Sequence, residues 1–270
     1  VRKDGAAIYV ETHISAVIFR GRPAFMGRVT DITERKMYEQ QRADFYAMLT
    51  HDIKSPLTTI MGYAELIKLK QGEAGRDVVE MAGYIEEGGE KLIRMVEEFL
   101  AVSRIESGKI AFKKTEVHVA ALLAKIHRDF GAQARKKGLE LNLDAAGGPA
   151  VAVLDKMYVE MAVSNLVQNA VNYTPAGGRI TIKAENAPGG EGLLAISVTD
   201  SGPGIPAEAL GRVFEKYYRV PGSGVKGSGL GLAVVKMVAE AHGGSIEMEC
   251  PEGGGCTFTM VLPVGPGPGA

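Results

Sequence analysis

The residues best suited to chemistry in the first third of the chain are His51 and the acid that follows it, Asp52. Apolar residues flank them at spacings of three and four, which predicts an amphipathic helix with His51 off its apolar stripe and facing water. Pro56 removes a backbone hydrogen bond and predicts a kink in this helix. A neutral imidazole is a nucleophile near physiological pH. A lone surface histidine is usually only solvated, so this segment needs support from elsewhere in the chain.

Three further clusters carry groups that suit a hard cation, a hydrogen-bond donor and a phosphate. Asn165, Asn169 and Asn172 recur at three- and four-residue spacing, so they share one face of a predicted helix, and amide oxygens suit a hard cation such as Mg²⁺. Asp200 ends an apolar strand and enters a glycine turn, where its carboxylate can accept a hydrogen bond from the exocyclic amine of adenine. The run 227–232, Gly-Ser-Gly-Leu-Gly-Leu, opens a helix whose N-terminus can hold phosphate.

With the stretch 214–219, Phe-Glu-Lys-Tyr-Tyr-Arg, these segments make five collinear elements over about residues 40 to 263. In order and spacing they resemble the sensor histidine kinases of two-component signalling. The resemblance implies an ATP-dependent protein-histidine kinase that autophosphorylates His51 and passes the phosphoryl group to an aspartate of a response regulator receiver domain. It also implies ATP and Mg²⁺ as cofactors and a homodimer as the functional form.

The resemblance assigns roles to individual residues. His51 is the phosphoacceptor, with Asp52 and Ser55 as its catalytic companions. Asp200 recognises adenine and Asn169 is the Mg²⁺ ligand. The remaining predicted ATP-binding residues are Asn165, Asn172, Tyr173, Gly202, Gly204, Tyr218, Arg219, Gly227, Gly229, Leu230 and Gly231. The glycine-punctuated stretch 206–228 is expected to be a lid over the nucleotide.

Three positions bear on what the chain does with ATP. Many family members have Lys in place of Asn172, and relatives with phosphatase activity usually have Thr or Asn in place of Ser55. Asn165 stands where the ATP-hydrolysing branches of the superfamily carry a water-activating Glu. Because an amide cannot act as a general base, Asn165 favours phosphoryl transfer over the alternative of a conformational ATPase. Intact nucleotide motifs argue against the other alternative, a scaffold that binds ATP and transfers nothing.

Composition excludes several classes of function. A net charge of -1 over 270 residues gives no electrostatic basis for nucleic-acid binding. No apolar run approaches a membrane span, so this fragment is expected to be cytoplasmic and not to contact the membrane, although the longer protein could be anchored upstream. The chain starts with Val, which indicates a fragment. Cys250 and Cys256 have no metal-ligand companions and are expected to be reduced thiols.

Periodicity divides the chain into four parts. Residues 1–33 resemble the C-terminal strands of a PAS-like sensor domain, the alternative being an independent hairpin with its turn at 20–23. Residues 34–108 predict two long helices, 34–70 and 77–106, whose uncovered apolar face calls for a dimeric four-helix bundle. Residues 264–270 are expected to be disordered.

Residues 109–263 predict a two-layer α+β sandwich like the ATP-binding domain shared by histidine kinases, Hsp90 chaperones and type II topoisomerases. The expected helices are 117–137, 156–173 and 229–242, and the expected strands are 110–114, 139–143, 151–154, 179–185, 193–199, 244–249 and 256–262. The histidines outside the His51 segment need no chemistry; His242, for example, fits a capping role at the end of a helix.

Overall fold

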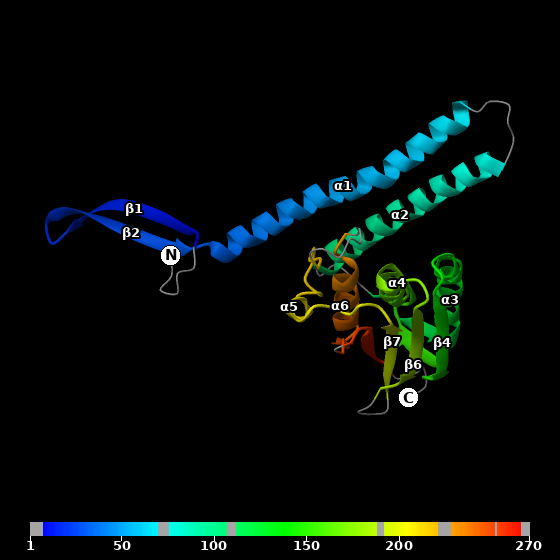
Figure 1. Cartoon of the computed structure of the whole chain (residues 1–270). Helices are drawn as coiled ribbons and strands as arrows, with labels where there is room; N and C mark the ends of the chain where they lie inside the picture. Colours follow the sequence, from blue (N-terminus) through cyan, green and yellow to red (C-terminus); the bar gives the residue numbers. More distant parts are fainter. Residues whose placement is uncertain are drawn as a thin grey trace. The chain divides into compact units, whose positions relative to one another are not determined.

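The structure is a computed structural model that describes residues 8–69, 76–106, 112–187, 192–220, 228–251 and 253–265 (Figure 1). The side chains of residues 40–52, which include His51 and Asp52, lie outside this description. The chain divides into two compact units, one up to Ser55 and one from Pro56 onward.

The first unit begins with an antiparallel hairpin. Strands β1 (Val10–Phe19) and β2 (Arg22–Asp31) are joined by Arg20 and Gly21, whose φ angles of 53° and 75° fit the two-residue turn preferred in β-hairpins. The predicted hairpin is therefore present. Among the described residues no further strand pairs with it, and large apolar side chains such as Ile18 and Phe25 are exposed. The origin of the hairpin in a PAS-like domain stays a prediction.

Two long helices follow, α1 (Thr33–Leu69) and α2 (Arg76–Glu106), close to the predicted bounds. Helix α1 continues through Pro56, which is buried. The helices meet where a Cβ on Gly88 of α2 would lie 3.0 Å from Ile60 Cγ1 of α1, and where the rings of Tyr63 and Tyr84 stack at 4.7 Å. The predicted helical hairpin is therefore present, and the loop between its helices falls outside the described residues.

The rest of the second unit is a two-layer α+β sandwich. Within the described residues, five strands form a sheet in the order β4-β6-β7-β9-β8, with β4 and β6 parallel and the other neighbours antiparallel. Its strands are β4 (Glu140–Gly147), β6 (Arg179–Asn186), β7 (Leu193–Asp200), β8 (Ser245–Glu249) and β9 (Cys256–Pro263). Helices α3 (Val119–Lys136), α4 (Lys156–Tyr173) and α6 (Gly231–Ala241) form the other layer, and α5 (Ala207–Leu210) is short.

The core lies between these layers because the strands alternate buried and exposed positions. In β6, for example, Ile180, Ile182 and Ala184 are fully buried. One predicted strand was wrong. No strand occupies 112–114, and the strand in this region is β3 (Thr115–His118), which pairs with β5 (Val151–Leu154). Pairing with β5 sets the position of β3. Local periodicity cannot predict a partner strand so far away in sequence.

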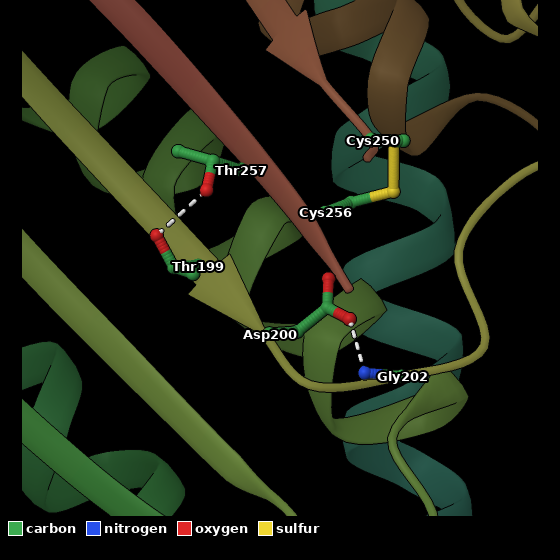
Figure 2. Close-up of a disulfide and its surroundings, with 6 residues drawn as sticks. All are labelled: Thr199, Asp200, Gly202, Cys250, Cys256 and Thr257. Carbon is green, nitrogen blue, oxygen red and sulfur yellow. Dashed lines mark hydrogen bonds between the residues drawn. A yellow bond between two sulfur atoms is a disulfide. The ribbon is translucent and has the colours of Figure 1, made fainter. Parts of the chain in front are cut away.

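The expectation of reduced cysteines was also wrong, since Cys250 and Cys256 form a disulfide (Figure 2). Strands β8 and β9 are antiparallel, and their last registered pair is Glu249 with Thr257. The next pair in the same register is Cys250 with Cys256, whose Cα atoms are 4.3 Å apart. Register therefore brings the two sulfurs together.

Candidate functional site

Helix α4 carries the predicted asparagines, and its start is firmly fixed. Asp155 is its N-cap, and one carboxylate oxygen accepts hydrogen bonds from the N–H groups of Met157 and Tyr158 at 3.1 and 3.4 Å. The other oxygen accepts a 2.8 Å bond from the N–H of Lys113. This buried carboxylate therefore ties the segment that follows α2 to the helix that bears the site.

Asn165 and Asn169 face the N-terminus of α6. A Cβ on Gly231, the first residue of α6, would lie 3.7 Å from Asn165 Cγ and 3.8 Å from Asn169 Nδ2. Glycine leaves this approach open, so the free N–H groups of the first turn of α6 lie beside the two amides. The structure thus brings together two groups that the sequence predicted separately.

This arrangement fits a hydrated divalent cation bound with phosphate. The Nδ2 atom of Asn165 is buried and has no hydrogen-bond partner among the described residues, so it can donate to a phosphate oxygen or a water. Among the described residues, no group of three or more His, Cys, Asp or Glu side chains could cage a metal. Mg²⁺ commonly binds with few protein ligands and completes its coordination with waters and phosphate oxygens. An asparagine face can supply those few protein ligands.

Polar groups in the last turn of α4 already have hydrogen-bond partners within the protein. Asn172 Oδ1 accepts a 3.0 Å hydrogen bond from Gln168 Nε2. Lys137 Nζ donates to the carbonyl oxygens of Val171 and Asn172 at 2.6 and 2.8 Å, where a cation also stabilises the negative end of the helix dipole. Lys137 was not predicted, because its partner is 34 residues away in sequence.

Asp200 lies at the end of β7 and opens the predicted adenine loop (Figure 2). The N–H of Gly202 donates to its carboxylate at 2.8 Å. Burial raises the pKa of the Asp200 carboxyl, and hydrogen bonds from the backbone N–H groups of Gly202 and Cys256 oppose that shift. A partly desolvated acceptor such as this gains most from an incoming donor.

The glycines of this loop are required by its geometry. A Cβ on Gly202 would meet Asp200 Oδ1 at 2.8 Å and the carbonyl oxygen of Tyr173 at 3.3 Å, and Gly204 has a φ of +79°. The loop therefore lies against the C-terminal end of α4, where Tyr173 is 39% exposed. Asp200, the asparagine face and the start of α6 consequently border one region of the nucleotide domain.

The stretch expected to be a lid is described up to Val220 and again from Ser228, so Gly227 lies outside the described residues. Tyr217 has a φ of +68° and donates its N–H to the carbonyl of Gly229 at 2.9 Å. The Arg212 guanidinium lies 4.3 Å from the ring centre of Tyr218, and Arg219 is half-buried. One backbone hydrogen bond thus joins Tyr217, inside the expected lid, to Gly229, just after it.

Ser228 connects this loop to helix α2. Its hydroxyl donates to the Glu98 carboxylate at 3.0 Å and accepts the N–H of Leu230 at 3.2 Å. Burial raises the pKa of Glu98, and the Ser228 hydrogen bond opposes the shift. No local sequence pattern predicts this contact, which joins residues 130 positions apart.

His242 proved to be more than a helix cap. It is buried, its Nε2 accepts the N–H of Asp155 at 3.2 Å, and its Nδ1–H therefore donates to the carbonyl of Val238 at 2.8 Å. The ring also packs on Phe112 at 4.7 Å. Burial lowers the pKa of His242 and keeps the ring neutral, which this pattern of one acceptor and one donor nitrogen requires.

The predicted phosphoacceptor residues His51 and Asp52 lie within α1. Ser55, four residues after His51, is exposed on the same helix. Within the described parts of the chain, no helix is both long and apolar enough to cross a bilayer.

Comparison with known proteins identifies two domains. The His Kinase A (phospho-acceptor) domain matches residues 41–108. The histidine kinase-, DNA gyrase B- and HSP90-like ATPase domain matches residues 154–266. The first match contains His51, and the second contains α4, the Asp200 loop and α6.

One curated relative is similar to this chain over most of its length. The chain is 29% identical over 238 residues to the sensor histidine kinase WalK of Bacillus subtilis, which covers 87% of this chain and 39% of WalK. The chain thus spans less than half the length of that curated relative.

Two solved structures share the fold. Full-length ShkA in complex with AMPPNP has a TM-score of 0.60 and 26% identity, with 83% of this chain and 45% of ShkA covered. Histidine kinase ThkA in complex with response regulator TrrA has a TM-score of 0.54 and 21% identity, with 98% of this chain and 77% of ThkA covered.

Proposed function

The chain belongs to the sensor histidine kinases, and we propose that it phosphorylates His51 with ATP and then passes the phosphoryl group to an aspartate of a response regulator receiver domain. One observation carries the proposal: the asparagine face of α4 and the N-terminus of α6 converge, with an amide rather than a carboxylate at Asn165. No general base for water stands there. The same chain supplies an alternative acceptor in His51, within its phospho-acceptor domain.

In this proposal the residues of the second unit bind and orient ATP. Asp200 accepts from the adenine amine while Gly202 and Gly204 let the backbone approach the base. The first turn of α6, which begins at Gly231, and the residues Gly229 and Leu230 just before it donate N–H groups to phosphate, and Arg219 adds positive charge. Asn169 holds Mg²⁺, which when bound neutralises phosphate charge during transfer. Asn165, Asn172, Tyr173, Tyr218, Gly227 and Leu230 complete the predicted site.

The transfer itself needs positioning more than covalent help. A neutral nitrogen of His51 attacks the γ-phosphorus, a nitrogen–phosphorus bond forms, the bond to the β–γ bridging oxygen breaks, and ADP leaves. The ring is then a positively charged phospho-imidazolium and loses its one remaining N–H proton, and Asp52 is proposed to orient the ring or take that proton. Ser55 keeps a hydroxyl one turn away from His51, on the same helix face.

The helical hairpin is proposed to form a homodimer. Apolar side chains along both helices are exposed in one chain, among them Met61 at 64% and Ile93 at 60%. Two hairpins that cover these faces would form a four-helix bundle. The response regulator partner is supported by the ThkA complex, whose partner is a response regulator. The hairpin β1–β2 is proposed to be the end of a PAS-like domain.

Incubation with γ-labelled ATP and Mg²⁺ tests this function. The chain should acquire label that is lost in acid and retained in base, as expected of a phosphoramidate, and should pass it to a receiver domain. A receiver variant in which the phosphorylatable aspartate is replaced by alanine should acquire none. Release of labelled inorganic phosphate without labelled protein would instead show an ATPase and contradict the proposal.

A further inference from the structure

Three residues lie in a row across neighbouring strands at one end of the sheet. Cys250 follows the last residue of β8, Cys256 begins β9, and Asp200 ends β7. Cys256 is the register partner of Asp200 on one side and is bonded to Cys250 on the other (Figure 2). The disulfide is therefore one strand away from the residue proposed to recognise adenine.

The backbone N–H of Cys256 is close enough to the Asp200 carboxyl to help lower its pKa, and Cys256 is the register partner of Asp200. The neighbouring Gly255 donates its N–H to the carbonyl of Gly202 at 2.6 Å. A Cβ on Gly254 would lie 2.8 Å from the same carbonyl oxygen. Gly254 and Gly255, which lie between the two cysteines, thus pack against Gly202 of the adenine loop.

This closed loop has little stiffness of its own. Gly253, Gly254 and Gly255 follow one another with φ angles of 115°, 108° and 78°, which glycine adopts readily. Glycine can also adopt many other conformations, so these residues do not fix the path of the segment by themselves. The disulfide restricts the ends of this segment. Without the disulfide, the position of the Cys256 N–H would depend only on the pairing of β9 with β7, and Cys256 is in the last pair of that register.

We propose that Cys250 and Cys256 are a reversible redox site, and that their oxidation state sets the affinity of the chain for nucleotide through Asp200. The proposal rests on the ATP-binding function proposed above. The reacting partner is a dithiol or disulfide, either a small molecule or a protein of that class.

The exchange balances as a two-electron step. Cys256 is only 4% exposed and Cys250 is half-buried, so an incoming thiolate reaches the sulfur of Cys250. It forms a mixed disulfide there and expels the Cys256 thiolate, which takes up a proton. The second thiol of the partner attacks the partner's own sulfur in the mixed disulfide and releases Cys250 as a thiol. Two electrons and two protons have then passed from the dithiol to the protein, and the partner leaves as its disulfide.

Reduction should weaken nucleotide binding because it lowers the fraction of molecules whose Asp200 turn is correctly placed. Losing one hydrogen bond of ordinary strength corresponds to about a fivefold increase in Kd. The proposed phosphate and Mg²⁺ contacts come from α4 and α6 rather than from the Asp200 turn, so binding should be weakened rather than abolished.

The test measures ATP binding by calorimetry, with Mg²⁺, on the full chain treated with glutathione disulfide or with dithiothreitol. The sequence has two cysteines, so a redox response can only come from this pair. Counting thiols by mass after alkylation should give none in the oxidised chain and two in the reduced chain. The oxidised chain should bind ATP about fivefold more tightly than the reduced chain.

Two variants complete the test. The double variant Cys250→Ser with Cys256→Ser should bind with the affinity of the reduced chain under both treatments. The matched control is Thr257→Val. It removes the 3.0 Å hydroxyl contact between Thr257 on β9 and Thr199 on β7, next to the Cys256–Asp200 pair, and should keep the full redox response. Equal affinity in both redox states would overturn the redox proposal and leave the kinase proposal standing. If neither the oxidised nor the reduced chain bound ATP, both proposals would be overturned.

Discussion

His242 offers the most demanding prediction about the nucleotide domain, because a single side chain joins α6 to the start of α4. The perturbation is His242→Ala. It leaves the buried N–H of Asp155 without an acceptor, at a cost of about 1–3 kcal/mol. It also removes the Nδ1–H bond to Val238 and the ring contact with Phe112, each worth about 0.5–1.5 kcal/mol. We expect a loss of about 3 kcal/mol in the free energy of unfolding.

The assay is urea unfolding followed by far-UV circular dichroism, with tyrosine fluorescence as a second probe since the chain has no tryptophan. His118→Ala is the matched control. His118 is exposed and its side chain makes no capping hydrogen bond, so that variant should stay within about 0.5 kcal/mol of wild type. A loss below about 1 kcal/mol in His242→Ala would refute the inference that this ring joins α6 to the start of α4.

The same ring sets a pH dependence with a definite sign. Burial lowers the pKa of His242 in the folded chain, so the unfolded chain binds a proton first as pH falls below about 6.5. Its contribution to stability is complete above that pH and is lost as pH falls toward the lowered folded pKa. Wild type should therefore lose more stability than His242→Ala between pH 7 and pH 5. Parallel pH profiles for the two proteins would contradict this account.

Three substitutions probe the nucleotide site. Asp200→Asn should weaken ATP binding by about 5- to 150-fold, the equivalent of about 1–3 kcal/mol for a mismatched polar contact, and unchanged affinity in calorimetry would remove Asp200 from base recognition. Gly229→Ala should impair nucleotide binding because a Cβ there would lie 2.9 Å from the backbone of Tyr217 at a φ of +66°, whereas Gly211→Ala, with open space around it, should bind as wild type. Glu98→Gln should raise the melting temperature more at pH 8 than at pH 4. Burial raises the pKa of this carboxyl, so ionising it costs stability as pH rises. An equal change in melting temperature at both pH values would be inconsistent with that cause.

The sequence predicted those features whose signals are local. The long helices, the β1–β2 hairpin and the positions of Asn165, Asp200 and Gly231 all follow from periodicity, glycine placement and residue spacing. The two-layer α+β sandwich also followed, because helix and strand patterns in this order allow few packed arrangements. The roles of the individual site residues stay predictions.

Features that depend on distant pairing were missed. The strand at 115–118 takes its place from β5, and Lys137 finds its carbonyl partners across the nucleotide domain. The disulfide could have been found. Two predicted strands separated by a glycine run placed Cys250 and Cys256 at opposite ends of one tight loop, and counting the register outward from that loop would have paired them.

The central claim is that ATP binding and phosphoryl acceptance reside in separate parts of this chain, and paired variants test it most directly. His51→Gln and Asp200→Asn should each be assayed for ATP affinity by calorimetry and for acid-labile label from γ-labelled ATP. We predict that His51→Gln binds ATP as wild type does and acquires no label, and that Asp200→Asn loses both affinity and label. Full acid-labile incorporation in His51→Gln would show that another residue is the acceptor and would contradict the account.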